Sequence, residues 1–396
     1  MTRNIALYPV YKFLSSLIFW QAAWFLYLQA ELSVADAILM YALYDIATTV
    51  LEVPSGWLSD QWGRRRTLII AAAAATVTAA MQAMGGGFWW FAFAQLLLGV
   101  HAAFASGTDS SLLYESLAAA DRSAEIERQE LVGWRASFSA LMVSAVTGGL
   151  LARAGLSWPY IATTIAYLGL FAVTLAFRDP PQRAIPTADR LATLKIALTT
   201  PVLTWLFALA VLMYAFSHVP FVFGQPFIER ALAGTPFASE TPAIAGAVTA
   251  AMMAVSLLVS LMAPGLRARF GLTAILLLAF ALQVALPGAL ALAAGPFAIL
   301  LLLSRMIPDA LARPFLLARI QPLLSDGSRA TYLSLQSLGG RVLFAATLWL
   351  AAGNTAEISS MPADDLSMIL GLYAIGGVAA LALLAATARR LPLDRP

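Results

Sequence analysis

The chain contains no cysteine and only two histidines among its 396 residues. The absence of cysteine excludes disulfides, thiolate metal sites and a cysteine nucleophile. Charge is also scarce, because charged residues make up 11% of the chain, hydrophobic residues 61%, and the mean hydropathy is +0.81. A typical soluble domain carries about 25% charged residues. These deficits indicate a protein that crosses a membrane several times.

The spans are expected to be helices rather than barrel strands, since the apolar segments are long and do not alternate. The net charge of +3 and isoelectric point near 9.3 do not indicate a nucleic-acid partner, because the basic residues lie in short loops. A bilayer core about 30 Å thick needs about twenty apolar residues per helix. A window of that length predicts about twelve spans, at 5–28, 34–57, 67–85, 88–117, 130–151, 158–177, 202–227, 241–266, 272–294, 296–323, 329–352 and 366–388.

The first span, 5–28, is expected to be retained rather than cleaved as a signal peptide, since no small-residue cleavage site follows it. Lys and Arg gather on one side of this arrangement, and only Arg153 and Arg230 fall on the other. Cytoplasmic loops collect basic residues. Both termini are therefore predicted to be cytoplasmic.

The segment 178–200 is too polar to cross the membrane and contains Pro180, Pro181 and Pro186. It is predicted to be a cytoplasmic loop between two six-helix halves, 1–177 and 201–396. An internal repeat supports this division, because the sequence from Leu58 to Gly63 matches that from Leu266 to Gly271 at an offset of 208.

The loop after the second span carries the most specific motif. It has the form G-x-L-x-D-x-x-G-R-[KR]-x-x-L, filled by Gly56, Leu58, Asp60, Gly63, Arg64, Arg65 and Leu68. With this motif the chain resembles the major facilitator superfamily over its whole length. The resemblance implies an all-α membrane protein of two pseudo-symmetric six-helix bundles that rock about a midplane site. The second copy of the motif has Ala268 where the first has Asp60.

The motif is predicted to act as a conformational latch. Its glycines allow a tight turn and close helix approach, Asp60 can accept from backbone amides of a facing helix, and Arg64 can pair with an acid of the fourth span. Glu115 is the preferred acid and Asp109 the second choice. Such a latch would hold the cytoplasmic side closed; alternatively, the arginines only set topology. The expected latch residues are Gly56, Asp60, Gly63, Arg64 and Glu115.

Ionisable residues inside spans form the second informative class, because a charge at the bilayer centre costs several kcal/mol without water or a partner. Asp109 is the primary candidate for proton coupling. The other candidates are Asp45, Glu52 and Asp309, and Glu52 can equally belong to the latch. Lys12, near the cytoplasmic entry of the first span, is expected to snorkel.

Arg305, Asp309 and Arg313 are spaced four residues apart and share one helix face. They form either a structural ladder of ion pairs or part of a substrate site. With Arg341 they favour an anionic or zwitterionic substrate group. The predicted aromatic and polar lining of the cavity, each member of which is also consistent with packing, comprises Trp24, Tyr44, Tyr214, His218, Phe221, Gln225 and Gln336.

Two positions differ from the drug-exporting branches of the superfamily. Gln95 stands where those branches have an arginine four residues before a glycine, and the sequence from Ser144 to Gly149 lacks the proline of their antiporter signature. Other stretches, such as 106–117 and 329–334, resemble a prokaryotic, drug-efflux-like branch. This resemblance implies a bacterial inner membrane.

The sequence thus predicts a secondary active transporter that exports an amphipathic small molecule in exchange for protons. Import of a nutrient or metal chelate is the alternative within transport, and a non-transporting membrane receptor is the alternative class. No phosphate loop, metal cluster or nucleophile constellation in the sequence supports an enzyme, and no cofactor is expected. The expected partners are the substrate, protons and the lipid bilayer, and the expected state is a monomer.

Overall fold

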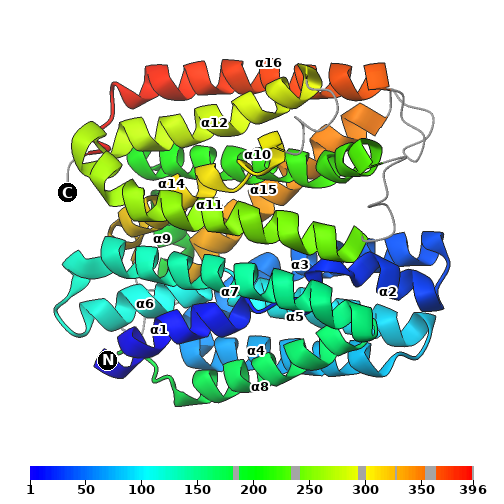
Figure 1. Cartoon of the computed structure of the whole chain (residues 1–396). Helices are drawn as coiled ribbons and strands as arrows, with labels where there is room; N and C mark the ends of the chain where they lie inside the picture. Colours follow the sequence, from blue (N-terminus) through cyan, green and yellow to red (C-terminus); the bar gives the residue numbers. More distant parts are fainter. Residues whose placement is uncertain (182–186, 233–240, 293–299, 326–327, 353–362, 395–396) are drawn as a thin grey trace. The chain divides into compact units, whose positions relative to one another are not determined.

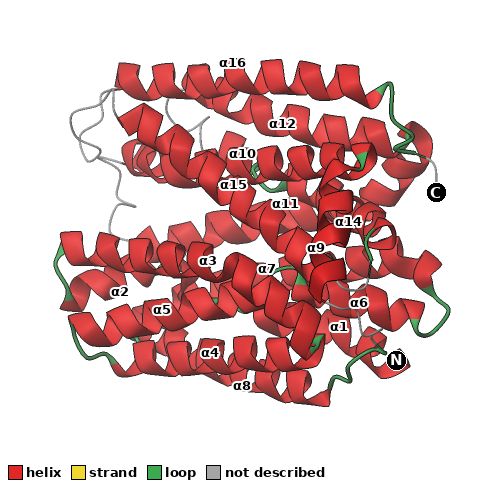
Figure 2. Cartoon of the chain, turned by 180° about the vertical axis from the view of Figure 1, so that it is seen from behind, coloured by secondary structure: helices red, strands yellow, loops and turns green. Residues whose placement is uncertain are grey.

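The computed structural model describes residues 1–181, 187–232, 241–292, 300–325, 328–352 and 363–394, and its regular structure in those ranges is helical (Figures 1 and 2). The helices are α1 Thr2–Ser15, η1 Phe19–Ala22, α2 Trp24–Glu31, α3 Val34–Trp62, α4 Arg64–Met84, α5 Phe88–Ala105, α6 Thr108–Ala118, η2 Ser123–Glu125, α7 Ile126–Ala154, α8 Trp158–Ala176, α9 Thr187–Thr199, α10 Pro201–Leu232, α11 Thr241–Phe270, α12 Leu272–Leu292, α14 Ile307–Ile320, η4 Gln321–Leu323, α15 Arg329–Ala352 and α16 Ala363–Ala388.

Several helices satisfy the length and hydropathy needed to cross a bilayer. Within the described residues there are eight such segments, at Arg64–Met84, Phe88–Ala118, Ser123–Ala154, Trp158–Ala176, Pro201–His218, Gly246–Phe270, Leu272–Leu292 and Ser367–Ala388. The prediction of an all-helical, multi-pass membrane protein is confirmed. The count of twelve spans is not confirmed.

Three predicted segments differ in detail from the helices observed. The first predicted span, 5–28, is divided into α1, η1 and α2, because the backbone tightens to i−3 hydrogen bonds at Ser16 and Leu17 and the α-helix ends. The fourth span is divided into α5 and α6 at Gly107, whose φ of 68° is left-handed. The predicted loop 178–200 contains the helix α9.

The described chain forms two compact units. The first comprises Met1–Ala197, Glu240–Ala254 and Leu317–Leu335, and the second comprises Leu198–Ser239, Val255–Leu316 and Gln336–Pro396. The first boundary falls inside the predicted loop 178–200, but the first unit also takes in two later segments. The division into domains 1–177 and 201–396 therefore stays a prediction.

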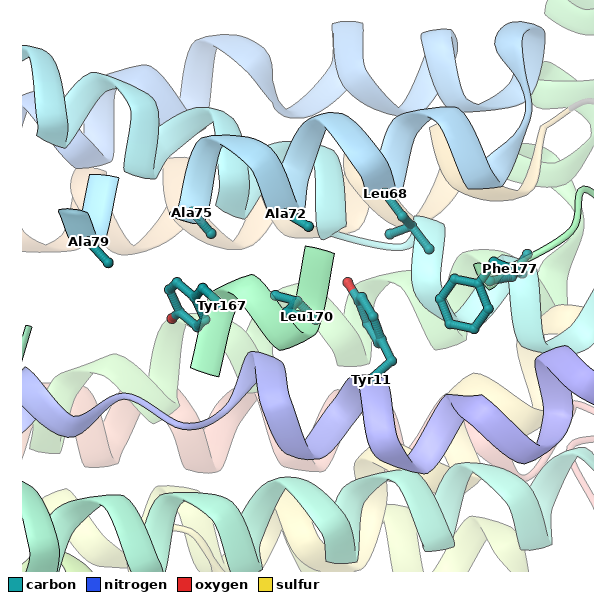
Figure 3. Close-up of a cluster of buried hydrophobic side chains, with 9 residues drawn as sticks. Tyr11, Leu68, Ala72, Ala75, Ala79, Tyr167, Leu170 and Phe177 are labelled. Atoms are coloured by element: carbon teal, nitrogen blue, oxygen red, sulfur yellow. The ribbon is translucent and has the colours of Figure 1, made fainter. Parts of the chain in front are cut away.

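The core of the first unit is built on small residues of α4. Figure 3 shows Ala72 and Ala75 of α4 facing Tyr167 and Leu170 of α8, with Tyr11 of α1 beside them. Lipid tails are as apolar as these side chains, so close packing rather than exclusion from water stabilises such contacts. Alanine allows the two backbones to approach, and the Thr76 hydroxyl donates to the Tyr167 carbonyl oxygen at 3.0 Å across the same interface.

Glycines allow two more close approaches in the first unit. A Cβ added at Gly99 of α5 would lie 2.5 Å from the Ala47 Cβ of α3. A Cβ added at Gly148 of α7 would collide with the carbonyl oxygen of Phe19 in η1. The small-residue stretch of the fifth predicted span thus seats η1 directly on α7.

The second unit packs α12 against α10 and α16. The Gln283 amide of α12 donates to the Met213 carbonyl oxygen of α10 at 3.1 Å, and the Trp205 indole of α10 donates to the Leu384 carbonyl oxygen of α16 at 3.1 Å. Both bonds are buried. In an apolar environment each satisfies a polar group that would otherwise be costly to bury.

Candidate functional site

The turn between α3 and α4 requires glycine. Gly63 has a φ of 98°, which side-chain-bearing residues rarely adopt, and an added Cβ would lie 2.7 Å from Asp179 Oδ1. Asp179 Oδ1 accepts a hydrogen bond from the Arg65 amide at 2.8 Å and so caps the first turn of α4. The turn is therefore held by an acid that follows α8.

The turn between α11 and α12 repeats this arrangement in the second unit. Gly271 has a φ of 85°, and Asp394, which follows α16, accepts from the Leu272 and Thr273 amides. The Thr273 hydroxyl donates to Asp394 Oδ2 at 2.6 Å. The two copies of the motif thus share a capped turn, although the second lacks the acid of Asp60.

Gly56 of α3 lies against the start of α15. A Cβ at this position would be 2.5 Å from Ser334 Oγ and 2.9 Å from the Ala330 carbonyl oxygen. This contact belongs to the first unit, which includes Leu317–Leu335. The first glycine of the motif is required because α3 and α15 approach too closely for a side chain.

Asp60 caps the N-terminus of α15. Its carboxylate, 2% exposed, accepts from the Ala330 amide at 3.2 Å, the Thr331 amide at 3.0 Å and the Thr331 hydroxyl at 2.6 Å. The first amides of a helix have no intrahelical acceptor, and the helix dipole favours a negative charge there. Asp60 therefore satisfies amides that would otherwise be buried without partners.

Arg64 lies between two acids and is fully buried. Its Nη1 is 2.5 Å from Asp60 Oδ1, its Nη2 is 2.6 Å from Glu115 Oε1, and its Nε is 3.2 Å from both Glu115 oxygens. Bidentate contacts of this kind are among the stronger hydrogen bonds in proteins. Of the two acids considered from the sequence, the structure places Glu115 against Arg64.

Arg329 is a further member of this cluster that was treated in the sequence only as a basic loop residue. Its Nη1 lies 3.7 Å from Glu115 Oε1, and its guanidinium lies 4.6 Å from the centre of the Tyr114 ring. It also donates to the Leu324 carbonyl oxygen at 2.7 Å. Two residues that follow it, Ala330 and Thr331, bind Asp60, so a basic residue at the start of a helix was the available signal.

Asp109, the primary proton-coupling candidate, is paired with Lys12 rather than Arg64. Lys12 Nζ lies 2.9 Å from Asp109 Oδ2, and the Ser110 amide donates to Asp109 Oδ1 at 2.7 Å. The Lys12 ammonium also lies 5.4 Å from the Trp134 ring centre. Lys12 thus points towards the interior of the first unit, whereas snorkelling was expected.

Glu130 was not recognised from the sequence as an acid within a span. It lies in the second turn of α7, has no exposed surface, and accepts hydrogen bonds from the Tyr8 hydroxyl at 3.3 Å and from the Ser110 hydroxyl. The sequence places it at the edge of a predicted span, where acids are common. Only the tertiary structure shows that α1 and α6 cover it.

The other coupling candidates are distributed over both units. Glu52 is fully buried on α3, and Asp45 is half-buried on the same helix. Asp309, on α14 in the second unit, is 5% exposed, and its Oδ1 lies 3.1 Å from Arg313 Nε. The i, i+4 pairing expected on this helix is present.

The second unit brings part of the predicted substrate lining together. Arg341 lies 5.5 Å from the centre of the Tyr214 ring, and the His218 ring stacks on Tyr214 at 4.2 Å between centres. Arg313, Arg341 and Asp309 act electrostatically on His218, and Asp309 acts on Arg305. These residues therefore form one cluster on α10, α14 and α15 with an adjacent residue, Arg305.

The remaining predicted lining residues are not part of this cluster as described. Gln336 is buried on α15. Trp24 and Tyr44 belong to the first unit, where Tyr41 lies 6.0 Å from Trp24 and 6.1 Å from Tyr44 between ring centres. Phe221 and Gln225 lie in the part of α10 whose side chains are outside the described residues. Where side chains are described, no group of three or more His, Asp or Glu could hold a metal ion.

Comparison with known proteins identifies the family. A family model described as Major Facilitator Superfamily matches residues 11–347, so the chain belongs to this superfamily of membrane transporters and is not an enzyme. No curated protein matches the sequence. The prediction of a superfamily transporter is confirmed, whereas the drug-efflux-like branch is not.

Two similar solved structures show the same fold. One is a bacterial homologue of the iron transporter ferroportin in the outward-facing state, with 16% identity, a TM-score of 0.69, and coverage of 98% of this chain and 99% of that chain. The other is a bacterial homologue of ferroportin in the outward-facing state with soaked iron, with 16% identity, a TM-score of 0.70, and coverage of 98% of each chain. At this identity the likeness concerns the fold.

Proposed function

We propose that this chain is a secondary active transporter of a bacterial inner membrane that exports an amphipathic small molecule in exchange for protons. The observation that carries the proposal is the buried cluster of Asp60, Arg64 and Glu115 at the start of α15. A membrane protein with a static role has little need for three buried charges that depend on one another. A transporter needs contacts that can form in one state and break in another.

The latch works through the helix N-terminus that Asp60 caps. While the carboxylate binds the Ala330 and Thr331 amides, α15 is tied to the turn between α3 and α4. If α15 withdraws, Arg64 and Glu115 keep each other paired, so the cost of opening is limited to the contacts of Asp60 and Arg329. The cytoplasmic side is closed in the latched state and open in the other.

The substrate site lies in the second unit. Three guanidinium groups, those of Arg305, Arg313 and Arg341, share the region of one carboxylate, Asp309. This excess of positive charge favours a substrate with an anionic or zwitterionic group. The stacked rings of Tyr214 and His218 next to Arg341 suit an aromatic or apolar portion of the same molecule.

Proton coupling uses carboxyl groups inside the spans. Asp109, Asp45, Glu52 and Asp309 are the candidates, and burial makes the charged form of each costly unless it is paired. Both termini are cytoplasmic, the two halves 1–177 and 201–396 move against each other, and the protein acts as a monomer.

Import of a metal chelate is the second candidate, because a similar structure is a ferroportin homologue with soaked iron. Direction distinguishes the two. Flux of anionic, zwitterionic and cationic fluorescent dyes is measured in inside-out and right-side-out vesicles with an imposed pH gradient. Gradient-driven uptake into inside-out vesicles supports export, whereas uptake only into right-side-out vesicles, or uptake of an iron chelate, supports import.

The substrate site is tested in the same vesicles. Arg341→Gln is expected to lower anionic dye flux at least about tenfold, since a charge-assisted contact contributes about 1.5–3 kcal/mol. Arg153→Gln, a basic residue of the first unit that is placed in no site, serves as the control. Equal flux in the two variants would place the substrate elsewhere.

A further inference from the structure

Glu130 differs from the other acids of the first unit in the groups that bind it. Glu115 faces the guanidinium groups of Arg64 and Arg329, and Asp109 faces the Lys12 ammonium and a backbone amide. The hydrogen bonds that Glu130 accepts from described residues come from two hydroxyls, those of Tyr8 and Ser110.

This difference decides which protonation states each site can hold. Guanidinium, ammonium and amide groups only donate, so they stabilise an ionised acid and cannot accept from a protonated one. A hydroxyl both donates and accepts. The hydroxyls of Tyr8 and Ser110 can therefore donate to the Glu130 carboxylate, and either can turn to accept a hydrogen bond from the protonated acid.

The charges that face Glu130 come from two helices packed against α7. Lys12 of α1 attracts the carboxylate and Asp109 of α6 repels it, and Tyr8 of α1 is the titratable group in direct contact. Lys12 and Asp109 are paired at 2.9 Å, with 17% and 16% of their side chains exposed. Since Ser110 follows Asp109 in the chain, all five groups form one cluster with a partly open edge.

We propose that Glu130, rather than Asp109, carries the coupled proton. The protonated acid leaves Lys12 fully paired with Asp109. When the O–H bond of Glu130 breaks, the proton passes to water at the open edge, the carboxylate keeps the electron pair, and Lys12 becomes shared between Glu130 and Asp109. This draws α1 towards α7, so Lys12 and Asp109 are positioning residues. The inference rests on the proposed proton coupling.

The protonation state is measured directly, without a substrate. Infrared difference spectra of the purified full-length protein are recorded during a titration from acidic to alkaline pH. The C=O stretch of a buried carboxylic acid is expected to disappear as the pH rises in the wild type and in Asp109→Asn. The band is expected to be missing at every pH in Glu130→Gln, and to move in frequency in Ser110→Ala.

Controls separate titration from misfolding and from transport. Asp121→Asn, at an exposed loop residue, is expected to reproduce the wild-type spectra, and thermal unfolding shows whether each variant is folded. An unchanged band in Glu130→Gln, or its loss in folded Asp109→Asn, overturns the inference. Dye flux in vesicles reports separately: wild-type flux that ignores the pH gradient contradicts the proposed coupling, whereas gradient-driven flux in Glu130→Gln contradicts the role of Glu130 alone.

Discussion

Asp60 caps a helix that begins about 270 residues later in the chain, with its Oδ2 lying 3.0 Å from the amide nitrogen of Thr331. The same carboxylate binds Arg64, which in turn binds Glu115. One short motif thus connects α3, α4, α6 and α15. Because these contacts are buried, single substitutions should have measurable effects.

Asp60→Asn is expected to weaken the attachment of α15. The amide side chain keeps the shape but loses the charge, and can direct an N–H group at the N–H donors of α15, at a cost of about 1–3 kcal/mol. Since the chain has no cysteine, a single cysteine introduced at Ser334 reports the exposure of this contact through its rate of thiol labelling. Faster labelling than in the Asp121→Asn control is expected; equal rates would contradict the latch.

Arg64→Met is expected to be more damaging than Asp60→Asn. It leaves two buried acids without their shared cation, and such a loss typically costs about 3–5 kcal/mol. Adding Glu115→Gln to Arg64→Met should recover part of the stability, because the repulsion between the acids is removed. Unfolding free energies in mixed micelles complete the double-mutant cycle. Strictly additive effects would show that Arg64 and Glu115 do not stabilise each other.

Gly148→Ala is expected to destabilise the first unit by about 1–3 kcal/mol, because the new methyl group collides with the Phe19 carbonyl oxygen and η1 must move. Gly265→Ala is the matched control, since a Cβ there meets nothing within 4 Å and alanine favours a helix by about 0.5–1 kcal/mol. Thermal unfolding midpoints should move in opposite directions. A tolerated Gly148→Ala would show that η1 is not held against α7.

Asp394 should make stability depend on pH. Partial burial raises its pKa, but hydrogen bonds from the Thr273 hydroxyl and from the Thr273 and Leu272 amides outweigh burial, so the pKa lies below its ordinary value. A lowered folded-state pKa stabilises the protein above the unfolded-state pKa, and this stabilisation is lost as the pH falls through the folded-state pKa. Asp394→Ala should therefore cost about 0.5–2 kcal/mol at neutral pH.

The stability difference between wild type and Asp394→Ala is measured at a series of pH values. It should shrink as the solution becomes acidic, because the protonated acid is a poorer cap. Asp179→Ala removes the corresponding cap from α4 and is the comparison within the same chain. A difference that does not change with pH would show that the carboxylate charge has no part in capping α12.

Local patterns predicted the helices better than the contacts. The predicted eleventh span, 329–352, coincides with α15, because an apolar run with a basic start is a local property. The breaks at Ser16 and Gly107 were missed, since both lie inside apolar stretches and depend on how neighbouring helices pack. The pairing of Asp309 with Arg313 was foreseeable from their spacing on one helix.

The sequence alone determined that this is a multi-pass helical membrane protein of the major facilitator superfamily, because composition, hydropathy and one motif are independent of tertiary contacts. The tertiary structure decided which buried acid has a cation. Lys12 and Asp109 are 97 positions apart, Arg64 and Glu115 are 51 apart, and Ser110 and Glu130 are 20 apart. Hydrogen bonds and ion pairs act over a few ångströms, so only the folded chain shows that Asp109 is paired and that Glu130 is enclosed by hydroxyls.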